Sequence, residues 1–303
     1  IYFDGISATF ANECDTLRLF AFYNDYKDRT LVIFNDQNRR LRRGDTWIAG
    51  GEWIHRFMDE LNSDLYYLHI DIDDDRNSAA EAIERNHDAD ENAKLDIVGG
   101  RLFGSLHPQV EYSGEVAFQF GEGIDPTSGN VADFSGLMAD LRLKLRAPEN
   151  TFLNPVLMLS YTYMSGDDLG SNDELEGWHP ALAEYPIWRE ELMPILNNGN
   201  WTNLMQYRAA LNLSLYDSET VGVNASGAWA MLISDRESNR IGGPPFGAAG
   251  EDDIGNLWSA FLDVQLKKIN LAFSLQASML DAGDYWVKGN TAEWLRFETV
   301  YTF

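Results

Sequence analysis

The last ten residues of the chain, 294–303, alternate between two kinds of side chain. Leu295 and Phe297 fall on one side of an extended segment, and Arg296 and Glu298 fall on the other. Successive side chains of a β-strand point to opposite faces, so this segment is predicted to be a strand with an apolar face and a charged face. Such a strand is typical of a sheet that separates lipid from water, although a β-sandwich shows similar alternation.

Thirteen segments show a comparable pattern, and most have the length of about 9 to 11 residues that a tilted membrane-spanning strand needs. They cover residues 1–12, 16–24, 47–58, 64–72, 95–105, 110–121, 131–146, 155–165, 201–216, 220–232, 256–266, 271–281 and 292–303. The connections alternate between short turns, such as 217–219, and long loops, such as 166–200. The architecture of a β-sandwich does not require short and long connections to alternate. The sequence therefore predicts an all-β, transmembrane, antiparallel up-and-down outer-membrane β-barrel.

The parity of the strand count suggests a larger barrel. Both ends of a bacterial barrel normally lie on the periplasmic side, which requires an even number of strands. Thirteen is odd. We therefore expect residues 1–303 to form a single β-barrel domain that lacks its N-terminal strands.

Composition excludes several other classes of protein. The chain has 48 acidic and 23 basic residues, a formal net charge of -25, which argues against nucleic-acid binding. The single cysteine, Cys14, excludes a disulfide framework. An aromatic content of 13% suits the aromatic girdles of a membrane barrel.

Enzymatic activity is not expected. The five histidines are scattered over different strands, loops and turns, and no nucleophile motif accompanies them. The glycine-rich stretch 242–247 lacks the lysine that follows a phosphate-binding loop. We therefore expect neither a catalytic site nor a bound cofactor.

Several motifs, in the right order over most of the chain, resemble the alginate export porins of the outer membrane. They are Phe3-Asp4-Gly5-Ile6, the segments 64–68 and 99–104, Tyr112-Ser113-Gly114-Glu115 with Gln119, and, most family-like, 160–168. The resemblance implies a monomeric barrel of about 18 strands, about five of them ahead of Phe3. It also implies an acidic polysaccharide as solute, from which the acidic excess of this chain departs.

Charged residues of both signs fall on the strand phases that we assign to the lumen. This set is Arg18, Glu52, Arg56, Arg101, Glu111, Glu115, Asp140, Arg142, Lys144, Arg208, Asp263, Arg296 and Glu298, together with His69 and Asp71. Guanidinium and carboxylate groups at a constriction would attract anions and bind sugar hydroxyls. The alternative is that they pair across neighbouring strands and hold the wall rigid. We expect the arginines to favour anions locally.

Two loops carry clustered charge. The loop 25–46 includes Arg39, Arg40, Arg42 and Arg43, which would recruit an anionic glycan or pair with lipopolysaccharide and acidic neighbours. An acidic run begins with Asp71, Asp73 and Asp75. It does not match an EF-hand, so solvated loops are the default interpretation and a Ca²⁺ site is the weaker alternative.

Two function classes remain from the sequence. The first is a passive porin in the outer membrane of a Gram-negative-type bacterium, embedded in lipid and lipopolysaccharide. Its solutes would be anionic or hydroxylated, an acidic polysaccharide or oligosaccharide among them. The second is a barrel that acts as a scaffold or sheath for a periplasmic or surface protein partner. Mixed polar residues directed inward favour the channel.

Overall fold

A computed structural model describes residues 4–24, 45–58, 60–73, 93–124, 131–168, 174–179, 202–236, 250–286 and 291–302. Strands and turns make up nearly all of these residues. One short 3-10 helix, η1 (Lys267–Ile269), is the only helical element in the described ranges. None of the described residues forms a helix long and apolar enough to cross a membrane.

Fifteen strands occur among the described residues. In the first half of the chain they are β1 (Asp4–Ala11), β2 (Asp15–Asn24), β3 (Asp45–Met58), β4 (Leu61–Asp73), β5 (Ala93–His107), β6 (Val110–Ile124), β7 (Val131–Phe134) and β8 (Leu137–Arg146). They continue as β9 (Val156–Met164), β10 (Glu174–Leu175), β11 (Leu204–Asp217), β12 (Val221–Ile233), β13 (Asp253–Leu266), β14 (Leu271–Ala282) and β15 (Ala292–Tyr301). Without β7 and β10, thirteen strands follow one another in chain order within one sheet. Over the described residues, the expected thirteen-strand up-and-down order is confirmed.

The segment 131–146, expected as one strand, is two. β7 ends at Phe134, and β8 begins at Leu137. Between them, the Ser135 N–H donates to the Leu175 carbonyl at 3.0 Å, and the Gly136 carbonyl accepts from the Gln119 N–H at 2.8 Å. The backbone groups of these two residues thus turn to different neighbours, which interrupts the ladder. β10 was not expected; it pairs parallel with β7, an exception to the antiparallel pattern.

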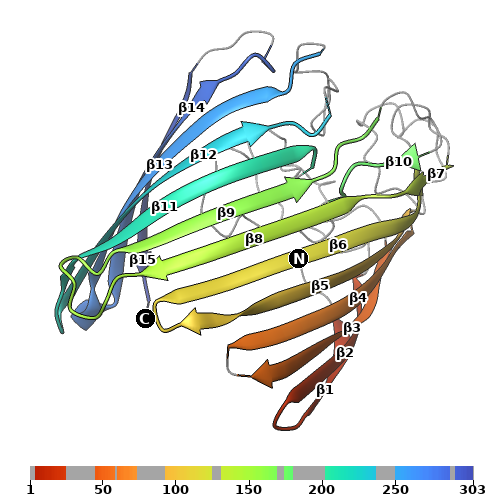
Figure 1. The fold of residues 1–303 in the computed structure, drawn as a ribbon, viewed down its shortest axis with the longest axis horizontal. Helices are drawn as coiled ribbons and strands as arrows, with labels where there is room; N and C mark the ends of the chain where they lie inside the picture. Colours follow the sequence, from red (N-terminus) through yellow and green to blue (C-terminus); the bar gives the residue numbers. More distant parts are fainter. Residues whose placement is uncertain are drawn as a thin grey trace, which may run out of the picture. The chain divides into compact units, whose positions relative to one another are not determined.

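The chain divides into two compact units. Unit 1 comprises Ile1–Leu102, Glu115–Leu137 and Asp167–Gly177, and unit 2 comprises Phe103–Gly114, Met138–Gly166 and Trp178–Phe303. Unit 1 therefore holds β1 to β4, with β7, β10 and the larger parts of β5 and β6. Unit 2 holds β8, β9 and β11 to β15. Within each unit, strands that follow one another in the chain lie side by side, as in β1 to β4 or β11 to β15 (Figure 1).

The strands of each unit separate an apolar face from a polar face. In unit 2, Leu211 is 42% exposed, whereas Gln206 and Arg208 on the other phase of the same strand are 0% and 8% exposed. In unit 1, Phe118 is exposed and Gln119 next to it is buried. The apolar face of unit 2 carries twelve large apolar side chains that alternate with the polar residues of their strands: Leu141, Leu143, Leu157, Leu159, Leu211, Leu213, Leu262, Val264, Leu271, Phe273, Phe297 and Tyr301.

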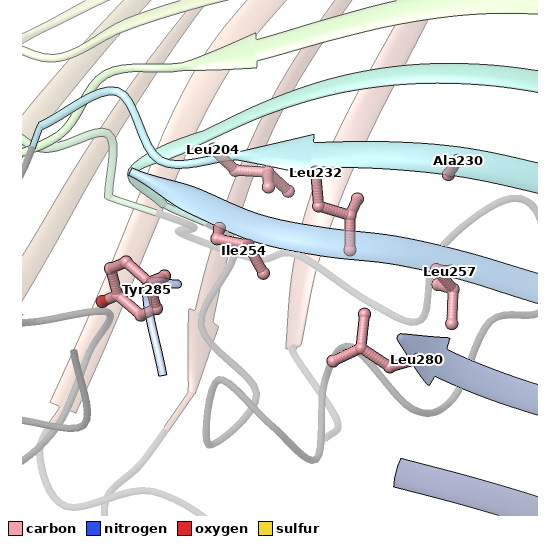
Figure 2. Close-up of a cluster of buried hydrophobic side chains, with 7 residues drawn as sticks. All are labelled: Leu204, Ala230, Leu232, Ile254, Leu257, Leu280 and Tyr285. Atoms are coloured by element: carbon pink, nitrogen blue, oxygen red, sulfur yellow. The ribbon is translucent and has the colours of Figure 1, made fainter. Parts of the chain in front are cut away.

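One end of the polar face in unit 2 is apolar instead, which the sequence did not lead us to expect. Ala230, Leu257 and Leu280 stand in the same cross-strand row as Arg208. They belong to a buried cluster with Leu204, Leu232, Ile254 and Tyr285 (Figure 2). Met164, Trp286, Ala292 and Trp294 pack against it. This core lies where the strands meet the longer connections.

Candidate functional site: the polar face

Two ion pairs cross neighbouring strands on the polar face of unit 1. Arg18 and Glu52 are aligned on β2 and β3, and Arg18 Nη1 lies 2.8 Å from Glu52 Oε2. Arg101 Nη2 on β5 lies 3.0 Å from Asp64 Oδ2 on β4. Asp64 is only 3% exposed, so this pair is held partly out of water.

A tyrosine spans three strands of unit 1. Tyr66 on β4 donates its hydroxyl hydrogen bond to Glu115 Oε1 on β6, with an oxygen–oxygen distance of 2.6 Å. The side chain passes over Gly99 on β5, where any Cβ atom would collide with the Tyr66 ring. Gly99 thereby permits a bond between strands that are not direct neighbours in the sheet.

Arg56 binds a turn rather than a carboxylate. It lies near the end of β3, aligned with Asn62 of β4, and its Nη2 donates to the Glu13 carbonyl at 2.8 Å. The turn between β1 and β2 is therefore tied to β3. This contact gives Arg56 a structural role.

In unit 2, a buried carboxylate is shared by two partners. Asp140 on β8 forms an ion pair with Arg142, two residues along the same face, at 2.5 Å. Its other oxygen accepts from the Thr162 hydroxyl of β9 at 2.8 Å. Asp140 and Thr162 are 8% and 3% exposed. Hydrogen bonds of this kind make a buried charge tolerable.

Glu111 on β6 bridges two cations of β8. Its Oε2 lies 3.1 Å from Lys144 Nζ, and its Oε1 lies 3.0 Å from Arg146 Nη2. All three side chains are partly open to solvent, so the bridge is worth little stability. Glu111 does, however, neutralise part of the positive charge that Lys144 and Arg146 place on this face of β8.

Four further charges of the set lie on β11, β13 and β15. Arg208 is aligned with Ser160 on one side and Ala230 on the other. Arg296 Nη2 lies 3.3 Å from Glu298 Oε1 on the same strand. Asp263 is aligned with Ser274, which is in turn aligned with Glu298. A continuous polar band therefore runs from β13 to β15.

The thirteen charged residues of the candidate set thus all lie on the polar face of their own unit. His69 and Asp71 do not, and their assignment was wrong. His69 is aligned with Ala49, on the phase of the exposed Trp47 and Leu65, and Asp71 is aligned with Trp47 itself. On this apolar face, Asp96 binds the Tyr67 hydroxyl at 2.5 Å and His69 Nδ1 at 2.8 Å.

Several candidates cannot be placed. Arg39, Arg40, Arg42, Arg43 and Asp75 lie outside the described residues. Asp73 is the last residue of β4. Within the described ranges, no group of three or more His, Cys, Asp or Glu side chains is arranged to hold a metal ion.

Sequence reasoning missed some members of the polar face. Arg146 has the same strand phase as Arg142 and Lys144, so periodicity would have found it. Strand alternation also places Asp64 and Gln206 on the polar face, but nothing in the sequence indicates that they are buried. Ion pairs such as Glu111 with Lys144 depend on strand register, which periodicity leaves undetermined.

A comparison with protein-family models and another with curated proteins gave no match. Among solved structures, the chain is similar to OpdO of Pseudomonas aeruginosa, with a TM-score of 0.50 and 12% identity over 99% of this chain and 70% of that one. The outer membrane protein OprD from Pseudomonas aeruginosa has a TM-score of 0.48 and 13% identity, over 97% and 67%. A mutant ferric enterobactin receptor, PfeA, from the same organism has a TM-score of 0.47 and 12% identity, over 95% and 42%.

The similarity to OpdO establishes the fold and nothing beyond it. At 12% identity the likeness to OpdO concerns the backbone alone, and together with the sheet order it confirms the antiparallel outer-membrane β-barrel class. This is the class in which one sheet face meets lipid and the other an aqueous interior. The narrower resemblance to the alginate export porins is not confirmed and stays a prediction.

Proposed function

We propose that this chain forms the wall of an integral outer-membrane channel that conducts solutes passively. The observation that carries the proposal is the division of each unit into two faces. Leu141 and Phe297 expose apolar surface, as lipid contact requires, whereas Arg208 and Asp140 lie on the opposite face. The apolar cluster of unit 2 is confined to one end of this face; an apolar core over its whole length would have favoured a closed scaffold.

The solutes that this face suits best are anionic or hydroxylated. Arginine offers a forked set of donors that matches carboxylates and sugar hydroxyls. Arg18, Arg101, Arg142 and Arg296 each lie beside a carboxylate, so the face presents paired charges rather than a uniform positive field. Paired charges bind hydroxyl groups through both donors and acceptors.

Single-channel recording in planar bilayers tests this proposal. The purified protein is expected to give stable open-channel current, and alginate fragments, other acidic oligosaccharides and neutral sugars are added as blockers. Block by acidic or neutral saccharides supports the solute class. Open channels that no saccharide blocks would support passive conduction but contradict the proposed solute class. Failure to conduct, with correct insertion verified by heat-modifiable electrophoretic mobility, would favour the scaffold for a periplasmic or surface partner.

A further inference from the structure

A hollow opens on the apolar face of unit 1, beside the short turn between β1 and β2. It has a volume of about 570 Å³ and is lined by Phe10, Ala11, Asn12, Asp15, Leu17 and Trp53. Sites for small ligands commonly have volumes of about 300–1,000 Å³. Phe10, Leu17 and Trp53 form one cross-strand row and are 60%, 37% and 43% exposed. The hollow therefore has both room for a ligand and access from outside.

One side chain of the hollow is a carboxylate, although it lies on the apolar phase of its strand. Asp15 is the first residue of β2 and has the phase of Leu17, and its side chain is 36% exposed. Trp53 Nε1 donates to its Oδ1 at 3.0 Å, Asn12 Nδ2 donates to its Oδ2 at 3.2 Å, and His55 Nδ1 lies 2.7 Å from Oδ1. Among the described side chains that line the hollow, none belongs to lysine or arginine. The hollow thus holds a fixed, accessible negative charge beside an indole ring.

The position of the hollow in the sheet corresponds to the headgroup level of a membrane. The turn 12–14 is one of the short connections, which are periplasmic in outer-membrane barrels. Tryptophan in such barrels gathers at the membrane interface, between apolar tails and polar headgroups. The leaflet on the periplasmic side of an outer membrane consists of phospholipids. Phe10 and Leu17 would therefore meet acyl chains, and Asp15 would meet a phospholipid headgroup.

The charge of the hollow distinguishes between phospholipid headgroups. Asp15 repels a headgroup that carries only negative charge, and the trimethylammonium group of phosphatidylcholine has no N–H to donate. The primary ammonium of phosphatidylethanolamine has a positive charge and three N–H donors, as a lysine side chain has. A carboxylate can accept at about four positions on its two oxygens, so Asp15 can accept from an ammonium in addition to its present contacts.

We propose that the hollow binds the headgroup of phosphatidylethanolamine and that Asp15 receives its ammonium group. The proposal rests on the membrane placement proposed above and names one lipid partner of the apolar face. The ammonium group donates to Asp15 and lies beside the Trp53 indole, because aromatic rings attract cations. Phe10 and Leu17 contact the glycerol and the first methylene groups of the acyl chains.

Native mass spectrometry of the intact, detergent-solubilised protein tests the site, because it counts bound lipids without requiring current. Phosphatidylethanolamine, phosphatidylcholine and phosphatidylglycerol with identical acyl chains are titrated in turn. We expect the wild-type protein to bind the ethanolamine lipid about fivefold more tightly than the choline lipid, the effect of one exposed ion pair, and Asp15→Asn to reduce this preference to about twofold or less. Glu13→Gln removes a carboxylate from the same turn, outside the lining of the hollow, and is the matched control that should keep the preference.

Two further measurements keep the test decisive if Asp15→Asn does not fold. Adding one and then two N-methyl groups to the ethanolamine removes N–H donors stepwise, and the wild-type protein should bind each lipid more weakly than the one before. Trp53→Leu removes the indole beside the carboxylate, so it should also weaken binding of the ethanolamine lipid.

Three results would overturn the site. They are equal affinity for ethanolamine and choline lipids in the folded wild-type protein, a preference that survives in folded Asp15→Asn, and an equal loss of preference in Glu13→Gln. Tighter binding of phosphatidylglycerol than of phosphatidylethanolamine would overturn it as well. A conducting channel without the lipid preference would refute the site alone. The preference in a protein that carries no current would refute the channel alone.

Discussion

A charge placed at mid-height on the apolar face should destabilise the protein, and the same charge on the polar face should not. Leu211 lies near the middle of β11 (Leu204–Asp217), is 42% exposed and is aligned with Leu157 and Gly227. Asn212, the next residue, lies on the polar face. The substitutions Leu211→Arg and Asn212→Arg therefore add the same side chain at nearly the same height on opposite faces.

The size of the destabilisation depends on how deep in the bilayer the new arginine lies. Arginine facing lipid at the bilayer midplane costs about 2–4 kcal/mol, falling to about 0–1 kcal/mol near the interface. Leu215, also on the apolar face, is four residues away, or about 13 Å along the strand. At a strand tilt of about 40° this is about 10 Å of depth. Leu211→Arg should lower the folding equilibrium constant roughly 30- to 700-fold, and Leu215→Arg at most a few-fold.

Equilibrium unfolding by guanidinium chloride in lipid vesicles measures these differences, provided that folding is reversible. The expected order of destabilisation is Leu211→Arg, then Leu215→Arg, then Asn212→Arg. If Asn212→Arg proves as costly as Leu211→Arg, the assignment of the two faces is refuted. An equal cost at positions 211 and 215 would contradict the placement of Leu211 near mid-height.

Three further outcomes are expected. Replacing both Arg142 and Arg208 by Ser should reduce anion preference in reversal-potential measurements, and an unchanged potential would remove these arginines from the ion path. Glu111→Gln leaves Lys144 and Arg146 without their shared carboxylate, so it should shift the same potential towards anions while changing stability by about 1 kcal/mol or less. Gly99→Ala should displace the Tyr66 ring and cost about 1–3 kcal/mol on unfolding. Tyr66→Phe, its control, removes only one hydrogen bond and should cost about 1 kcal/mol; a larger loss in the control would refute the steric explanation.

Strand periodicity predicted most of the sheet because lipid contact demands strict alternation. It failed for the segment 64–72, where both phases contain apolar residues: Tyr66 and Ile70 on one, Leu65 and Tyr67 on the other. With no clear contrast, the phase of His69 and Asp71 was assigned wrongly. The alignment of Glu52 with Tyr66 resolves the phase, and that is tertiary information.

The candidate site was predictable as a face but not as a set of contacts. Arg142 and Arg208 could be placed on the polar phase from alternation alone. Their cross-strand neighbours, Ser160 among them, depend on register. The break at Ser135–Gly136 and the buried amide of Gln206 likewise arise from backbone and side-chain partners distant in the chain.

The bond from Tyr66 across Gly99 to Glu115 has a mechanical consequence. A sheet yields most readily when one strand slides along its neighbour, because each ladder can re-form in a shifted register. The hydrogen bond from Tyr66 on β4 to Glu115 on β6 cannot re-form after such a slip. Movement of either strand would shift the Tyr66 ring away from Gly99, whose missing Cβ atom makes room for the ring. The hydrogen bond can also close only after β5 has taken its place between β4 and β6. The Tyr66 hydrogen bond therefore forms late, after all three strands have assembled in the correct register, and it then resists sliding of these strands past one another.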